Sequence, residues 1–141
     1  MKIVNRRAKF DYQIIETYEA GISLTGAEVR AVKNGKVDIS HAHIKIINNE
    51  ILMINCVITS DNVEDLSRTR KILLHKNQIV SLASKVEAKK LTLVPVLVYN
   101  KGPLIKVRIA LAKSKKKFEK KRVIKKRELE REAGREFRNK I

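Results

Sequence analysis

The chain has 141 residues, 43% of them apolar and 33% charged, which suits one domain of modest core plus a tail. Its 32 Lys and Arg against 15 acidic residues give a net charge of +17, which favours a polyanionic partner because each neutralised phosphate releases condensed counterions. The chain has no run of 18 apolar residues, so no membrane span is expected. Its N-terminus becomes polar too early for a signal peptide. Cys56 is the single cysteine, so no disulfide forms within the chain, and we expect a cytoplasmic protein.

The N-terminal half reads as strands with one short helix. Residues 12–18 and 22–24 are rich in β-formers. Thr25 followed three residues later by Glu28 has the spacing of a capping box, and Asn34-Gly35 is a stop signal. A helix from about Gly26 to Lys33 is therefore predicted.

Two hairpins and a second helix are predicted next. Residues 42–47 and 50–54 flank Asn48-Asn49, and Asn tolerates the positive φ of a two-residue turn. Residues 91–99 and 104–112 flank a turn over residues 100–102, and Pro95 is expected at a sheet edge or bulge. Between the hairpins, apolar residues at 79, 82, 83 and 86 indicate an amphipathic helix ending near residues 89–90. Cys56, in an apolar run, is expected in the core.

Strands with few helices and no βαβ alternation predict a mainly β fold, a closed antiparallel barrel with helices packed outside. The charge divides the chain into residues 1–112, with a net charge of +8, and a tail over residues 113–141, with a net charge of +9. The tail has good helix formers but only a thin apolar stripe, so we expect it to be disordered when free and helical on RNA.

Signatures of catalysis are scarce. There is no Gly-rich phosphate loop, no Cys pair and no convincing acid/base pair, so neither catalytic residues nor a cofactor is predicted. His41 and His43 lie two apart and would share one face of a strand, as two metal ligands lacking a third or, in the alternative interpretation, as partly exposed strand residues. His75 is expected to begin a helix or loop.

Three segments are candidates for RNA binding. Residues 5–12 interleave cations with aromatics that can stack on unpaired bases, unless they form a basic arm whose Phe10 and Tyr12 lie in the core. Residues 67–71 place two arginines on one face, either for phosphate contact or for solvent. The third is the basic tail, whose alternative role is to aid solubility.

At these segments the chain resembles the small protein B (SsrA-binding protein, SmpB) family. The matching stretches, in family order over nearly the whole chain, are residues 5–12, 18–29, 35–40, 67–75, 93–95 and 107–117. The Glu-Ala-Gly of residues 19–21 and the Arg-Thr-Arg-Lys of residues 68–71 are the most specific pieces.

The resemblance implies an OB-like barrel that binds the tRNA-like domain of transfer-messenger RNA (tmRNA) and acts in trans-translation, the rescue of stalled ribosomes. The complex would enter the 70S ribosome with the elongation factor that carries aminoacyl-tRNA, and the tail would fold in the decoding centre and mRNA channel. We expect a monomer. The implied RNA-binding residues are Asn5, Arg6, Arg7, Lys9, Tyr12, Glu19, Arg68, Arg70 and Lys71, with Glu19 orienting a neighbouring cation or accepting from RNA, and Leu73 as an apolar contact or a core residue. The implied ribosome-binding tail residues are Lys115, Lys116, Lys117, Glu119, Lys120, Lys121 and Arg122.

The chain departs from the family pattern at Ser114, Glu119 and Lys121, where Gly, Asp and Arg are usual. Lys121 cannot form the bidentate fork of an arginine. The alternative function is that of a ribosomal protein or other OB-fold translation-associated protein, which would bind RNA without preference for a tRNA-like fold.

Overall fold

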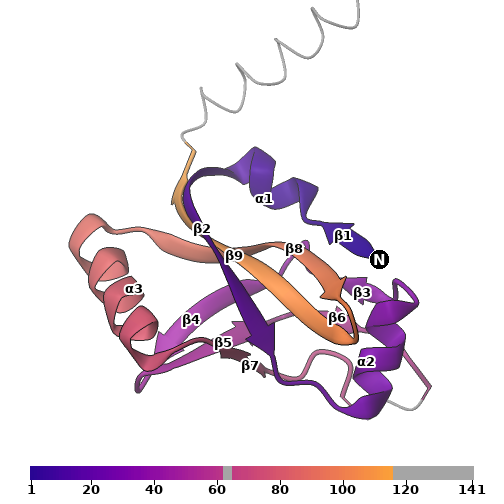
Figure 1. Ribbon diagram of the computed structural model, residues 1–141. Helices are drawn as coiled ribbons and strands as arrows, with labels where there is room; N and C mark the ends of the chain where they lie inside the picture. Colours follow the sequence, from indigo (N-terminus) through magenta and orange to yellow (C-terminus); the bar gives the residue numbers. More distant parts are fainter. Residues whose placement is uncertain (62–64, 116–141) are drawn as a thin grey trace, which may run out of the picture.

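The computed structural model describes residues 1–61 and 65–115 of the chain (Figure 1). The tail predictions from residue 116 onward therefore lie outside the described residues. The elements in chain order are β1 (Lys2–Val4), α1 (Arg6–Asp11), β2 (Tyr12–Ile22), α2 (Gly26–Lys33), β3 (Val37–Asp38), β4 (His43–Ile47), β5 (Glu50–Ile54), β6 (Val57–Ile58), β7 (Arg70–Leu73), α3 (Lys76–Lys89), β8 (Thr92–Lys101) and β9 (Leu104–Ser114).

Seven of the strands form one antiparallel sheet that nearly closes on itself. The strand order is β1-β8-β4-β5-β7-β2-β9, and β8 also pairs with β9, so a ring runs from β8 through β4, β5, β7, β2 and β9 back to β8. The link between β4 and β8 is narrow, because it consists of the single pair Ile44 and Leu93. The mainly β, antiparallel class predicted from the sequence is confirmed.

The long strands β8 and β9 bury side chains on both faces. Facing the inside of the ring, Val107, Ile109 and Leu111 join the main core, which also includes Cys56 at 1% exposure. On the other face, Ala110 and Ala112 join a smaller cluster under α1. This double burial explains why β9 is apolar almost without interruption after residue 108. Burial raises the pKa of the Cys56 thiol to about 11, as its predicted core position implies.

The two helices predicted from the sequence are present on different sides of the ring (Figure 1). The predicted span of α2 is confirmed: Thr25 Oγ1 accepts from the Glu28 backbone N–H at 3.2 Å, and Glu28 Oε1 accepts from the Thr25 N–H at 2.9 Å. α3 begins earlier than its apolar pattern indicates, since His75 is its N-cap. It ends at Lys89, and the C-cap residue Lys90 has a left-handed φ of 50°. No described helix is long and apolar enough to cross a membrane.

Both hairpins form, with one correction. Asn48 and Asn49 take the positive φ values of 51° and 63° that a two-residue turn requires. The second turn is tighter than predicted, because Lys101 pairs with Leu104 and leaves only Gly102-Pro103 between the strands. The ladder between β8 and β9 shifts register between residues 95 and 97, so Pro95 lies at a bulge, as expected.

The sequence reading missed α1 and misplaced the end of the folded unit. Asn5 caps α1 by accepting from the Ala8 N–H at 3.1 Å, so the basic N-terminal segment is a helix rather than an arm. At the other end, β9 continues to Ser114, and the Lys115 N–H donates to the Asp11 carbonyl at 2.9 Å. The boundary predicted after residue 112 therefore falls inside a strand.

Candidate nucleic-acid interface

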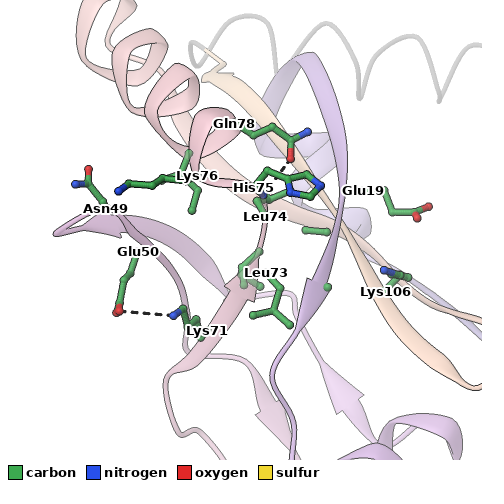
Figure 2. A pocket seen from close by; sticks show the side chains of 14 residues that line it. Glu19, Asn49, Glu50, Lys71, Leu73, Leu74, His75, Lys76, Gln78 and Lys106 are labelled. Carbon is green, nitrogen blue, oxygen red and sulfur yellow. Dashed lines mark hydrogen bonds and ion pairs between the residues drawn. The ribbon is translucent and has the colours of Figure 1, made fainter.

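A hollow of about 600 Å³ opens where the C-terminal end of β2 meets the end of β7 and the start of α3 (Figure 2). Elements far apart in the sequence build it. Glu19 comes from β2, Glu50 from β5, Lys71 and Leu73 from β7, and Lys106 from β9. The turn between β4 and β5 and the first turn of α3 complete its rim, so the ring itself fixes the arrangement.

Lysines outnumber glutamates around this hollow. Lys71, Lys76 and Lys106 line it together with Glu19 and Glu50. Lys71 Nζ lies 3.6 Å from Glu50 Oε1, and both side chains are about half exposed. An exposed pair of this kind is weak, so Lys71 can exchange its partner for a phosphate.

Glu19 is held by neighbours from the second hairpin. It accepts from the Tyr99 hydroxyl, and Lys101 Nζ lies 3.4 Å from its Oε1. The hydrogen bond from Tyr99, assisted by Lys101, lowers the pKa of Glu19 and keeps it charged. The prediction that Glu19 orients a neighbouring cation agrees with this geometry, while its contact with RNA stays a prediction.

An apolar side chain lies between the charged groups. Leu73 is 50% exposed although it lies in a strand, and it points into the hollow in Figure 2. It packs against Gly21, where an added Cβ would lie 3.2 Å from Leu73 Cβ. A side chain larger than that of glycine at position 21 would push Leu73 out of its present position. Of the two roles considered for Leu73, the exposed contact fits the structure and the core role does not.

The N-terminal candidates divide between buried and exposed positions. Arg6, Arg7 and Lys9 are exposed on α1, and Tyr12 is half-buried at the start of β2. Asn5 is 3% exposed, and its Nδ2 donates to the carbonyls of Ile39 at 2.9 Å and Pro95 at 2.8 Å. The amide of Asn5 is therefore used inside the fold, and its predicted part in forming the RNA surface stays a prediction.

The two arginines of the Arg-Thr-Arg segment do share one face, but it is the inner one. Arg70 is 0% exposed; its Nε donates to Glu28 Oε2 at 2.7 Å, and its Nη1 donates to the Cys56 carbonyl at 2.5 Å. Arg68 donates to the other oxygen of Glu28 and remains partly exposed. No part of Arg70 reaches solvent in this structure, and its predicted place on the RNA-binding face stays a prediction.

Glu28 is the buried centre of this network, and the sequence pattern indicated only its capping role. Burial by itself would raise the pKa of Glu28, but hydrogen bonds from Arg68, from the Thr25 backbone and from Arg70 outweigh burial and bring the pKa to about 2. The carboxylate thereby fastens α2 to β7 and sets the start of the strand that carries Lys71 and Leu73.

Of the predicted tail residues, only Lys115 is described. Its Nζ donates to the Lys9 carbonyl at 3.1 Å, which fixes the chain against α1 where it leaves β9. The other predicted tail residues, Lys116, Lys117, Glu119, Lys120, Lys121 and Arg122, lie outside the described residues.

Lys76 and Lys106 were not among the predicted site residues. A signal existed for Lys106, since basic residues alternate with apolar ones over residues 106–109 and so place Lys106 on the open face. The described residues contain no group of three or more His, Cys, Asp or Glu that could hold a metal ion. His41 is exposed in the turn before β4, and His43 is half-buried at its first position.

Comparisons with known proteins agree with the resemblance seen in the sequence. A family model described as SmpB protein matches residues 2–139. The chain belongs to the SmpB family. An SsrA-binding protein of Persephonella marina is 42% identical over 142 residues, covering 97% of this chain and 93% of the relative. One from Mycoplasma mycoides is 40% identical, covering 92% and 91%.

A comparison with solved structures gives the same result. One, described as "tmRNA-SmpB: a journey to the center of the bacterial ribosome", is similar to this chain with a TM-score of 0.69 and 43% identity. The similarity covers 82% of this chain and 85% of the solved chain. The shared fold therefore includes most of the ring of strands described above.

Proposed function

We propose that this chain binds the tRNA-like domain of tmRNA and delivers it to stalled ribosomes in trans-translation, as a cytoplasmic, monomeric RNA-binding protein with no catalytic step of its own. Membership of the SmpB family over residues 2–139 carries the proposal. The net charge of +17 supports it, because RNA is the polyanion that such a charge would recruit.

The lysine-lined hollow of Figure 2 is the proposed contact surface for the tRNA-like domain. Lys71 and Lys106 would meet backbone phosphates, and Leu73 would pack against an exposed sugar or base. Glu19 would accept from a ribose hydroxyl or base while holding Lys101. Arg6, Arg7 and Lys9 on α1 would extend the RNA contact, and Tyr12 would support them.

The nearly closed ring is proposed to act as an OB-like barrel, with the β4–β8 pair at its seam. We propose that the tail works separately, in the decoding centre and mRNA channel of the 70S ribosome. The elongation factor that carries aminoacyl-tRNA would then meet the chain only through the shared RNA. The division of labour is motivated by the charge split, since about half the net charge lies in residues 113–141.

The first test is binding of the full chain to the tRNA-like domain, with a canonical tRNA and a plain RNA duplex as competitors at rising salt. A preference for the tRNA-like domain that persists at high salt is expected, because nonspecific attraction fades there. Equal affinity for all three RNAs, lost together as salt rises, would refute the proposal and favour the ribosomal or other OB-fold translation protein.

The second test separates the ring from the tail. Because β9 ends at Ser114 and Lys115 is bonded to α1, the cut belongs after residue 115. A chain of residues 1–115 is expected to bind the tRNA-like domain with near-native affinity and to fail in rescue of stalled ribosomes. Loss of RNA binding with retained rescue would contradict the division of labour.

A further inference from the structure

A second hollow, separate from that of Figure 2, lies where α1 faces the segment that leads into β4. It measures about 260 Å³, and Arg7, Tyr12, Ser40, His41 and His43 are among the residues that line it. Four of these five side chains end in a planar π system. The volume is below the range of pockets that enclose drug-sized molecules, and it suits one ring system rather than a length of chain.

Arg7 and His41, which both line this hollow, are in direct contact. Nη1 of Arg7 lies 3.0 Å from Nδ1 and 3.3 Å from Nε2 of the same imidazole. The in-plane directions of the two ring nitrogens diverge, so one guanidinium nitrogen cannot bond to both in the plane of the ring. Nη1 of Arg7 therefore lies over the face of the imidazole, where the planar guanidinium can share a stacking surface with the ring. The Arg7 side chain is 55% exposed, which leaves much of the stack accessible.

The inner wall is apolar and firmly placed. Ala8, Ala42 and Val94 line it, and the half-buried Tyr12 ring packs on the cluster that contains Ala8 and Val94. Buried Asn5 also lines the hollow and joins α1 to the carbonyls of Ile39 and Pro95. The hollow is thus preformed, and little ordering cost is added when a flat ligand enters.

One acidic group decides between a base and a phosphate as occupant. Asp11 also lines the hollow, and its Oδ2 lies 3.4 Å from Arg7 Nε. A carboxylate repels a phosphate but accepts hydrogen bonds from the amino edge of adenine, cytosine or guanine. A nucleobase is favoured as the occupant, because the hollow combines planar side chains, an apolar inner wall and a carboxylate.

We propose that this hollow binds a single unpaired nucleobase of RNA, stacked on the Arg7–His41 pair. The site deepens the RNA contact proposed for α1, since Arg7 and Tyr12 belong to both, and to that extent it rests on the proposed function. It shares no residue with the hollow of Figure 2, so the two hollows can be tested separately.

The test uses the full chain and two short probes of equal charge. One is a single-stranded RNA hexamer, and the other is an abasic hexamer with the same sugar–phosphate backbone. The imidazole NMR signals of the three histidines report the site, since His41 and His43 line the hollow and His75 lies on the other surface. At raised salt, the intact hexamer is expected to shift His41 and His43 saturably, and the abasic hexamer is expected not to.

Two substitutions sharpen the test. His41→Ala removes half of the stack, and we expect it to weaken hexamer binding about 5-fold or more, the lower bound for loss of one base-stacking side chain. Arg7→Lys keeps the charge but removes the planar group, so it should also weaken binding, whereas a pure phosphate contact would be little changed. Val80→Ala is the matched control, because Val80 is exposed on α3 and lines neither hollow, and its affinity should equal that of the unaltered chain.

Several results would overturn the proposal. They are equal shifts of His41 and His43 with intact and abasic hexamers, an absence of any shift at these two histidines, or a Val80→Ala effect that equals or exceeds that of His41→Ala. None of them decides the competition experiment, which measures the preference of the full chain for the tRNA-like domain.

Discussion

Replacing the buried Glu28 by glutamine should destabilise the protein strongly, although Glu28 lines neither of the two hollows proposed to bind RNA. Gln also serves at the third position of a capping box, so the cap on Thr25 is kept. The charge opposite Arg70 is lost, however, and a guanidinium at 0% exposure is left without its counter-ion. Breaking a buried pair on one side costs about 3–5 kcal/mol. That is a large part of the roughly 5–15 kcal/mol by which a domain is stable.

Thermal and urea unfolding of the 141-residue chain measure this loss. At about 4 °C per kcal/mol for a domain of this size, Glu28→Gln should lower the Tm by roughly 12–20 °C. Adding Arg70→Met to it should restore part of the stability, because no buried charge then remains. Glu16→Gln is the matched control, since Glu16 pairs with Lys85 at the surface. If the Tm of Glu28→Gln equals that of Glu16→Gln, the buried network around Glu28 does not stabilise the protein.

The same carboxylate predicts an acid-sensitive contribution. The pKa of Glu28 falls from 4.5 to about 2 on folding, so its stabilisation is fully present above about pH 4.5 and is lost as the pH falls towards 2. The contribution is roughly 3 kcal/mol. Unfolding free energy measured against pH should show a shallower slope over this window in Glu28→Gln. An unchanged slope would mean that other carboxyls account for it.

Three further outcomes are expected. Lys106→Ala should reduce the slope of log affinity for the tRNA-like domain against log salt by about 0.7–0.9, and Lys45→Ala, on β4 outside this hollow, should leave it unchanged; equal slopes would exclude a phosphate contact at Lys106. Gly21→Ala should displace Leu73 and weaken binding of the tRNA-like domain while the Tm changes little, and unaltered affinity would remove Leu73 from the contact. Cys56 should resist thiol reagents at pH 8 until urea unfolds the chain, because its pKa of about 11 and its burial suppress the thiolate; rapid native labelling would contradict its place in the core.

The elements with local signals could be predicted from the sequence. The capping box placed α2, the Asn48-Asn49 pair placed the first hairpin, and Pro95 was expected at an edge or bulge. Each of these follows from chemistry within a few residues. α1 was missed because its signal is a single residue, Asn5, followed by a turn with only one small buried side chain.

The direction in which the arginines point could not be predicted. Spacing of two along a strand gives a shared face, but which face is inner depends on Glu28, which lies 40 residues from Arg68 and 42 from Arg70. In the sequence, Arg68 and Arg70 have the pattern of a phosphate-binding site, because their counter-ion Glu28 is not a sequence neighbour. Lys71, one position on, faces the opposite side and is exposed, as alternation requires.

The pairing of β2 with β9 sets an order for folding during synthesis. Tyr12 pairs with Ser114, and the ladder continues to Gly21 and Lys106. Strand β2 therefore cannot form this ladder until β9 has been synthesised. At about 5–20 residues per second, roughly 5–20 s pass between the synthesis of β2 and that of β9. During this interval a long strand edge stays unpaired and open to aggregation. A messenger RNA truncated before codon 104 would encode a chain without β9, and such a chain could not close the ring of strands. Its nascent product would be an incomplete fold that has to be degraded.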